Sequence, residues 1–131
     1  MEYRNPIIAK AGYYNGQRYK SQMEIKYAKY LDFLIKHREI QDWKYEPRIF
    51  DFRDVKGKKG KHCGVVTYKP DFWILNKNGL EEYAEVKGYM DKRSQTKLNS
   101  MRIYYPNVKI SVIDGNWFKQ HRKDAKLLGW G

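Results

Sequence analysis

A carboxylate and an ammonium group stand two residues apart in the segment YAEVKGY, residues 83–89. The segment is rich in residues that favour β-strands. Strand side chains alternate between the two faces of a sheet, so Glu85 and Lys87 point to one face while their apolar neighbours point to the other. The spacing therefore predicts an acidic and a basic side chain next to each other on one face of a strand.

A second carboxylate, Asp71, follows Pro70 in the preceding apolar run. If the two runs pair as a hairpin, Asp71 and Glu85 approach each other where the proline interrupts the hydrogen-bonded ladder. Two buried carboxylates repel, so a divalent cation with oxygen ligands is the expected partner. Mg²⁺ suits this donor set, with Mn²⁺ as a substitute and the Val86 carbonyl as an additional ligand.

Lys87 has three candidate roles beside such a metal. It can orient the attacking water, help to deprotonate it, or stabilise a pentavalent phosphate. The alternative is that Glu85 and Lys87 form only a surface ion pair, worth ~0.2 to 1 kcal/mol. For the Glu-x-Lys pattern alone the ion pair is favoured, because three-letter patterns of common residues arise by chance.

Periodicity and turn residues predict the elements that must position these groups. Asn15-Gly16 predicts a two-residue hairpin turn, and a helix follows from Ser21 to about His37. Predicted strands span 43–52, 64–76 and 80–87, the last two joined by a turn at 78–79; a helix after Gly88 ends at Pro106, a strand spans 108–113, and a final basic helix capped by Asn116 runs to Gly129. We expect a single α/β domain over residues 1–131, with a mixed sheet covered by helices.

Composition points to a polyanionic partner. The 131 residues carry 27 Lys and Arg against 15 Asp and Glu, a formal charge of +12. Such a surface attracts nucleic acid. No apolar run approaches a membrane span and no signal peptide is visible, so we expect a cytoplasmic protein without a membrane partner. Cys63 is the only cysteine, which excludes an internal disulfide and a multi-cysteine zinc site.

The full constellation resembles the PD-(D/E)xK nuclease superfamily. Pro70-Asp71, thirteen intervening residues and then Glu85-Val86-Lys87 match its motif, on a hairpin with a helix before and a helix after. The resemblance implies a restriction-endonuclease-like core: a helix, a three-stranded antiparallel meander, a helix and a strand, here with an extra N-terminal hairpin and a C-terminal basic helix. It also implies that Asp71 and Glu85 hold the metal and that Lys87 assists catalysis.

Many members of that superfamily add a glutamate from the first helix, and here Glu24 is available for that position. The resemblance implies that Glu24 reaches the metal directly or through water. A second interpretation is as good from the residues alone: Ser21-x-x-Glu24 is a capping box, in which the glutamate folds back on the Ser21 amide.

Residues 16–112 resemble more specifically a phage-associated group that includes bacteriophage endonuclease I, a resolvase of branched DNA, and transposon end-cleaving subunits. The shared features are a Ser-x-x-Glu helix, a strand with Glu46 to Arg48, the Pro-Asp-Phe and Glu-Val-Lys-Gly strands, and a Lys-rich helix closed by Tyr105-Pro106. The resemblance implies structure-selective cleavage of branched DNA in a bacterial or phage-infected cell, with a homodimer supplying two active sites.

Basic residues are the candidate contacts to DNA phosphates. They are Lys56, Lys58, Lys59 and Lys61 in a Gly- and Lys-rich loop, with Arg93 and Lys97 on the helix after Lys87. Gln95 is a weaker candidate on that helix. Tyr68 and Trp73 can stack on bases, although packing in the core is the favoured interpretation for both.

Two other functions fit the same residues. A non-catalytic DNA-binding protein would use the basic surface and keep the carboxylates merely paired. An RNA-directed nuclease or RNA-binding module would use the same charge on another substrate. The sequence favours a Mg²⁺-dependent DNA endonuclease over both, because the carboxylates, the lysine and the order of elements agree.

Overall fold

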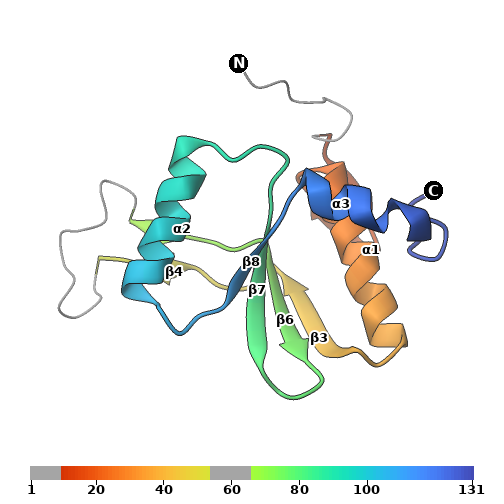
Figure 1. The fold of residues 1–131 in the computed structure, drawn as a ribbon, viewed down its shortest axis with the longest axis horizontal. Coiled ribbons are helices and arrows are strands. Elements are labelled where there is room, and N and C mark those ends of the chain that lie inside the picture. The colour runs from red at the N-terminus through yellow and green to blue at the C-terminus, as the bar shows by residue number, and fades with distance from the viewer. Residues whose placement is uncertain (1–9, 54–65) are drawn as a thin grey trace.

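The computed structural model describes residues 10–53 and 66–131, so Lys56, Lys58, Lys59 and Lys61 lie outside the described residues. The chain begins with a hairpin of β1 (Gly12–Tyr14) and β2 (Gln17–Tyr19). Asn15 and Gly16 form its turn, both with positive φ, as the sequence predicted. The described residues form a mixed α/β structure (Figure 1).

Four strands form the central sheet. In spatial order they are β3 (Ile40–Tyr45), β6 (Phe72–Asn76), β7 (Glu81–Val86) and β8 (Ile110–Ile113). The β3–β6 and β6–β7 pairs are antiparallel, and the β7–β8 pair is parallel. The predicted antiparallel hairpin of the second and third strands is confirmed, with Gly79 at φ +87° in its turn.

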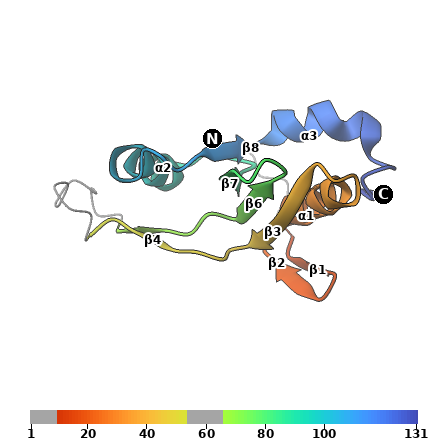
Figure 2. The same ribbon diagram turned by 90° about the horizontal axis from the view of Figure 1, so that it is seen from below.

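Two helices flank this sheet, α1 (Gln22–Lys36) and α2 (Lys92–Tyr104). Figures 1 and 2 place α1 on one side of the central strands and α2 on the other. Ser21 caps α1 by accepting a hydrogen bond from the Glu24 amide, and Asp91 caps α2 in the same way. Both helices begin close to the positions that the sequence predicted.

The first helix ends in a left-handed turn. The Arg38 amide donates to the Ile35 carbonyl at 3.0 Å, and the Glu39 amide donates to the Leu34 carbonyl at 2.8 Å. These two bonds define a Schellman motif, in which the residue after the cap adopts positive φ. Arg38, rather than the glycine usually found there, occupies that position at φ +60°.

The apolar side chains form two separate cores. One lies between α1 and the sheet, with Tyr27, Leu31, Phe72 and Ala84 among its members. The other lies beside α2 and includes Phe50, Phe52, Tyr68, Tyr83, Met101 and Tyr104. Alternation along β7 explains the division, because Tyr83 and Ala84 point to opposite faces of one strand.

The predicted strand over 43–52 is wrong in extent, and so is the one over 64–76. The first is divided into β3 and β4 (Phe50–Asp51), and the second into β5 (Thr67–Tyr68) and β6. β4 and β5 pair with each other in a separate two-stranded sheet. Pro47 and Pro70 lie in the two breaks, where neither can donate a ladder hydrogen bond.

The final helix also differs from the prediction. Asp114, not Asn116, is its cap, because the Asp114 side chain accepts a hydrogen bond from the Trp117 amide. The helix α3 spans only Gly115–His121 and continues as a 3₁₀ turn, Arg122–Asp124. Trp117 packs edge-on against Tyr27 and Tyr30, so α3 packs against α1.

Candidate active site

Asp71 and Glu85 face each other across the two central strands. The register pairs Phe72 with Ala84, and one step outward along both strands places Asp71 opposite Glu85. Both carboxylates are buried, with 5% and 7% of their surface exposed. The Val86 amide donates to Asp71 Oδ2 at 2.7 Å, so the strand that carries Glu85 also holds Asp71 in place.

Glu85 is fixed by a residue from outside the central sheet. The buried Tyr68 hydroxyl, on β5, donates to Glu85 Oε1 at 2.8 Å. The Lys87 ammonium lies 3.8 Å from Glu85 Oε2 on the same side of the chain. The strand alternation inferred from the sequence therefore brings Glu85 and Lys87 together as expected.

Glu24 is the third buried carboxylate, with 4% of its surface exposed. Its Oε1 accepts hydrogen bonds from the Lys20 amide at 2.8 Å and from the Tyr45 hydroxyl at 3.1 Å. The Glu24 amide donates to the cap residue Ser21, but the Glu24 side chain bonds the Lys20 amide, one residue before the cap, so the predicted bond to the Ser21 amide is not formed. Its charge also acts on Asp71 and helps to raise the pKa of that carboxyl group, so the cap and the site share one residue.

Ionisation of the carboxyl groups is unfavourable in this region, because three of them are buried close together. Burial, followed by the charges of Glu85 and Glu24, raises the pKa of Asp71 to about 8, against the lowering effects of the Val86 amide and Lys20. Burial also raises the pKa of Glu85, although the Tyr68 hydrogen bond and the charge of Lys87 oppose it. A cation placed here would relieve the repulsion.

Three lysines surround the carboxylates. Lys20, Lys87 and Lys97 all stabilise the ionised form of Glu85 and oppose the rise of its pKa. Burial lowers the pKa of Lys97, and the positive charge of Arg93 lowers it further. Lys97 and Arg93 were both predicted as phosphate contacts, and Lys97 lies within charge interaction of Glu85, with Arg93 beside it on α2.

Lys20 belongs to a further ion-pair network that includes Glu46 and Lys69. The Lys20 ammonium lies 2.7 Å from Glu46 Oε2, and the Lys69 ammonium lies 3.6 Å from Glu46 Oε1. Burial alone would lower the pKa of Lys20, but the hydrogen bond and charge of Glu46, with Asp71 and Glu24, raise it on balance. The Glu46 amide also donates to the Asp71 carbonyl at 2.8 Å, which joins this network to the site.

A glycine brings the two halves of the site close together. A methyl group built at Gly88 would lie 3.1 Å from Met23 Sδ, a tighter contact than side chains normally make. Met23 precedes Glu24 on α1, and Gly88 follows Lys87. The missing side chain at position 88 thus lets α1 approach the end of β7.

The donor set suits a metal held by few protein ligands. Within residues 10–53 and 66–131 no group of three or more His, Cys, Asp or Glu side chains is arranged to hold a metal ion. Asp71 and Glu85 together still match the needs of Mg²⁺, which binds through one or two carboxylates and retains waters. Glu24 is engaged by Lys20 and Tyr45, which favours an indirect role for it.

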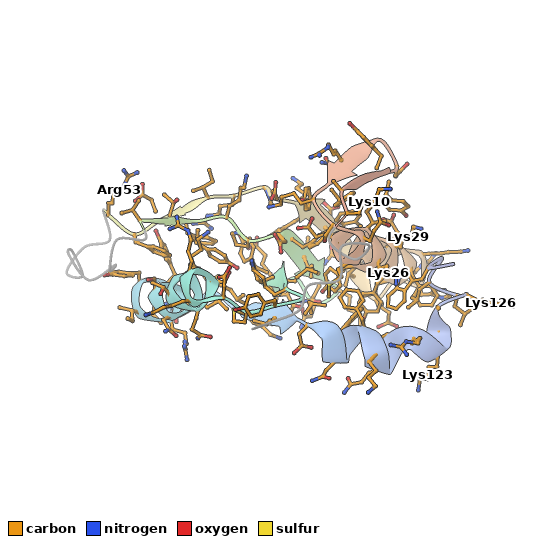
Figure 3. All side chains as sticks on the ribbon, turned by 90° about the horizontal axis from the view of Figure 1, so that it is seen from above. Lys10, Lys26, Lys29, Arg53, Lys123 and Lys126 are labelled. Atoms are coloured by element: carbon orange, nitrogen blue, oxygen red, sulfur yellow. The ribbon has the colours of Figure 1, made fainter. Side chains whose placement is uncertain are left out.

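The other predicted contact residues fall into different places. Tyr68 and Trp73 are used within the fold, Tyr68 against Glu85 and Trp73 through its indole NH to Glu81 at 2.7 Å. Gln95 is exposed and hydrogen-bonds Asn99 on its own helix. Figure 3 shows further lysines around α1 and the C-terminal segment: Lys10, Lys26, Lys29, Lys123 and Lys126.

Sequence reasoning missed four residues of this site: Lys20, Tyr45, Glu46 and Tyr68 as the hydrogen-bond donor to Glu85. Glu46 carried a signal, since it stands directly before Pro47 in the strand segment that the resemblance includes. No pattern in the sequence pointed to Tyr45 or Tyr68, because their hydroxyls reach the carboxylates only through the pairing of strands that are distant in sequence.

The chain was compared with known proteins. A family model described as "Protein of unknown function (DUF1064)" matches residues 4–120. No curated protein and no solved structure matches the chain. Among the helices described, none has the length and apolarity needed to cross a membrane. Because the match covers most of its length, the chain belongs to the DUF1064 family.

Proposed function

We propose that this member of the DUF1064 family is a metal-dependent DNA endonuclease that hydrolyses phosphodiester bonds. One observation carries the proposal: Asp71, Glu85 and Glu24 are buried close together, and burial, followed by the charges of Glu85 and Glu24, raises the pKa of Asp71 to about 8. Burying like charges costs stability, and strongly shifted carboxyl groups cluster at functional sites. The net charge of +12 suits a polyanionic substrate.

The order of elements supports the same proposal. The helix α1, the antiparallel strands β3, β6 and β7, the helix α2 and the parallel strand β8 occur in the order that the resemblance to PD-(D/E)xK nucleases implies, with β4 and β5 inserted between β3 and β6. This order supports the proposal that the fold has a restriction-endonuclease-like core. Asp71 and Glu85 lie on the β6–β7 hairpin, where that motif requires its acidic residues.

Mg²⁺ is the proposed cofactor, with Mn²⁺ as a substitute. Asp71 and Glu85 would hold it, with the Val86 carbonyl and waters completing the set. When bound, such a metal activates water and stabilises the charge that develops on the phosphate.

The side chains of this chain have separate tasks. The Tyr68 hydroxyl and the Val86 amide hold the two carboxylates in fixed orientations. Lys87, at the edge of the site, places a positive charge beside Glu85, where it can stabilise the phosphate or orient the attacking water. Lys97 and Arg93 extend the positive charge along α2 for the DNA backbone.

Branched DNA is the proposed substrate class. Phosphate contacts position a protein on DNA without reading sequence, so basic residues around a carboxylate site favour selection by structure. Cutting both strands of a junction requires two sites, and we propose a homodimer to supply them.

Cleavage assays with site variants test the proposal. The full chain is incubated with Mg²⁺ or Mn²⁺ and four substrates: linear duplex, flap DNA, four-way junction and single-stranded RNA. We expect cleavage of the branched DNA. Asp71→Asn, Glu85→Gln and Lys87→Ala should each reduce the rate at least about a hundredfold while DNA binding in EDTA persists.

Two surface variants serve as matched controls. Glu39 and Lys77 form an exposed ion pair, so Glu39→Gln and Lys77→Ala should cleave as the wild type does. Undiminished cleavage by the three site variants would refute the site. DNA binding without nicking by either metal would identify a non-catalytic DNA-binding protein, and cleavage of RNA alone would identify an RNA-directed nuclease.

A further inference from the structure

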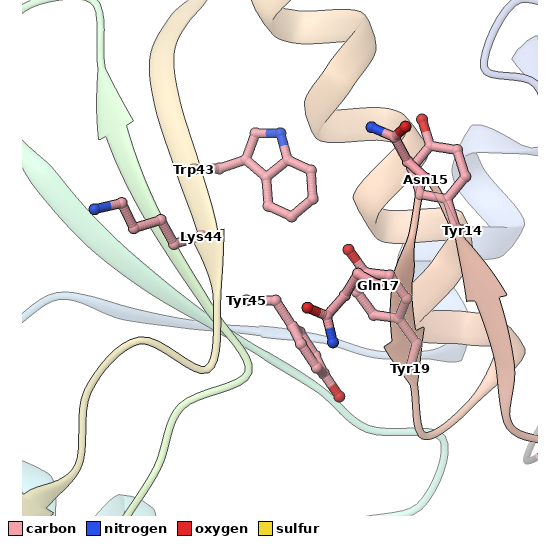
Figure 4. A pocket seen from close by; sticks show the side chains of 7 residues that line it. All are labelled: Tyr14, Asn15, Gln17, Tyr19, Trp43, Lys44 and Tyr45. Carbon is pink, nitrogen blue, oxygen red and sulfur yellow. The ribbon is translucent and has the colours of Figure 1, made fainter.

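A small aromatic pocket lies between the N-terminal hairpin and β3. Its volume is about 240 Å³, and it is lined by Tyr14, Asn15, Gln17, Tyr19, Trp43, Lys44 and Tyr45. Figure 4 shows the hairpin residues on one side and Trp43 and Tyr45 of β3 on the other, while the Lys44 side chain extends away from the hairpin. The pocket is open to solvent, and it shares Tyr45 with the carboxylate site.

We propose that this pocket binds one unpaired nucleobase of the DNA strand that enters the carboxylate site. The inference rests on the proposed function and deepens it, because it names the structural feature of the DNA that the protein selects. An unpaired base presents two flat faces and a polar edge. The pocket offers aromatic walls for the faces and side-chain amides for the edge.

The aromatic walls are held in place by the fold. Asp32 on α1 accepts hydrogen bonds from the Trp43 indole NH, at 2.9 Å, and from the Tyr14 hydroxyl. Tyr19 and Tyr45 contact each other with ring centroids 4.5 Å apart. Rings fixed in this way provide a stacking surface for a base without further ordering on binding.

Two amides stand at the rim of the pocket. Asn15 lies in the hairpin turn and Gln17 begins β2. Carboxamides have both a donor and an acceptor, which is what the hydrogen-bonding edge of a base requires. Gln17 Nε2 donates to the adjacent Arg18 carbonyl in an exposed contact that a base edge can replace.

A cationic ligand fits this pocket less well than a base. Aromatic pockets bind methylated ammonium groups when a carboxylate or the ring faces are available to the cation. Here Asp32 already accepts from Trp43 and Tyr14, and Lys29 Nζ lies 5.6 Å from the centroid of the Tyr14 ring. The chain also carries a charge of +12, which repels cations.

One side chain links the pocket to the carboxylates. Tyr45 lines the pocket, and its hydroxyl donates to Glu24 Oε1 at 3.1 Å. Tyr19 lines it as well and immediately precedes Lys20, whose ammonium acts on Asp71 and Glu85. A base in the pocket would therefore belong to a nucleotide close to the phosphate at the site.

Binding of an unpaired base in the pocket would account for the proposed preference for branched DNA. In an intact duplex every base is stacked and paired, and extracting one is costly, whereas an unpaired base is free to enter. Flaps, gaps and junction centres expose such bases. The pocket would thus favour cleavage at the boundary between duplex and single strand.

Flap DNA carrying 2-aminopurine tests the proposal without cleavage. The fluorescent base is placed at one unpaired position at a time, and binding of the full chain is followed in EDTA. We expect strong quenching at one position only. An abasic residue at that position should weaken binding roughly tenfold, as loss of one stacked base does.

Two rim variants and one control assign the effect to the pocket. Gln17→Ala and Asn15→Gly remove the amides and leave the turn geometry intact, since glycine tolerates the positive φ of Asn15. Both should weaken quenching and reduce the penalty of the abasic residue. Tyr13→Ala on the same hairpin, where Tyr13 is 73% exposed and outside the pocket, should behave as the wild type.

The outcomes separate this inference from the proposed function. Cleavage of flap DNA with no position-specific quenching, or with quenching that both rim variants retain, overturns the pocket and leaves the nuclease standing. Position-specific quenching that the rim variants abolish, without cleavage in either metal, supports the base pocket and refutes the nuclease. If millimolar tetramethylammonium reversed the quenching of 2-aminopurine, the pocket would be a cation pocket, and the inference would be overturned.

Discussion

At the scale of single residues, the buried carboxylates are a cost to the fold. Asp71 receives a hydrogen bond from the Val86 amide, but burial and its acidic neighbours outweigh that contact and raise its pKa to about 8. A neutral side chain of the same shape would avoid the cost. Sites that trade stability for chemistry in this way are stabilised when the reactive group is removed.

Asp71→Asn should therefore stabilise the metal-free protein at pH 8. The folded-state pKa of about 8 lies above the ordinary value of 3.8, so the contribution of Asp71 to stability is full below pH ~4 and is lost as the pH rises to about 8. Asparagine does not ionise, so the variant does not lose this stability as the pH rises. Thermal unfolding in EDTA should show a midpoint several degrees above the wild type at pH ~8, and a smaller difference at pH ~5.

The matched control is Glu39→Gln, an exposed acid in a surface pair, which should leave both midpoints unchanged. A lower midpoint for Asp71→Asn at pH 8 would mean that Asp71 is stabilising in its ionised form. The electrostatic basis of the site would then be wrong.

Lys20 is expected to stabilise the fold through the acids it faces. Lys20→Met removes the ammonium 2.7 Å from Glu46 and its effect on Asp71 and Glu85. Because Lys20 is partly solvated, we expect a loss of only about 1 kcal/mol in the free energy of unfolding, measured with urea in EDTA at pH 7. Lys77→Met, in the exposed pair with Glu39, should change it by less than about 0.5 kcal/mol. If the two variants changed the free energy of unfolding equally, Lys20 would not stabilise the fold through the acids of the site.

At the scale of elements, the sequence predicted the turns and helix starts that depend on neighbouring residues alone. The hairpin at Asn15-Gly16 and the start of α1 at Ser21 follow from turn and cap residues, and the structure has both. The facing of Asp71 and Glu85 followed from strand alternation together with one turn. Local patterns were sufficient wherever the partner residues are close in sequence.

The elements that the sequence did not predict depend on distant contacts. β3 ends at Tyr45 because Glu46 adopts φ +48°, while its amide bonds the Asp71 carbonyl and its carboxylate meets Lys20 and Lys69. None of these partners is adjacent in sequence. The Tyr68 contact to Glu85 likewise requires the β4–β5 sheet, which appears only when the two predicted long strands are each divided.

The end of α1 offers a prediction about one element alone. Arg38 occupies the left-handed position of the Schellman motif at φ +60°, where a side chain is unfavourable. Arg38→Gly should increase the free energy of unfolding by about 0.5 to 1 kcal/mol in urea denaturation. Arg38→Ala keeps a side chain in the same conformation and should give no such gain. A destabilised glycine variant would show that the arginine side chain, not the backbone, secures this turn.

At the scale of the whole molecule, charge should govern DNA binding. A formal charge of +12 over 131 residues predicts that binding releases counterions from the phosphates. Affinity for flap DNA in EDTA should fall about a hundredfold or more between about 50 and 200 mM salt, as measured by fluorescence anisotropy. Asp71→Asn should show the same salt slope, since it removes no phosphate contact. Affinity that is independent of salt would rule out the basic surface as the DNA contact.

The parallel strand β8 has a consequence for the order in which the protein is made. Glu24 comes from a part of the chain distant from the hairpin of Asp71 and Glu85, and β7 acquires its second neighbour only when Ile110–Ile113 is available. During synthesis the N-terminal parts leave the ribosome first, and contacts between distant segments form last. A chain interrupted before residue 110 would leave Glu85 on an unpaired sheet edge. Under the proposed function, the capacity to cut DNA would thus arise only after residues 110–113 have been made, and translation products that stop before them would not cleave the genome of the cell.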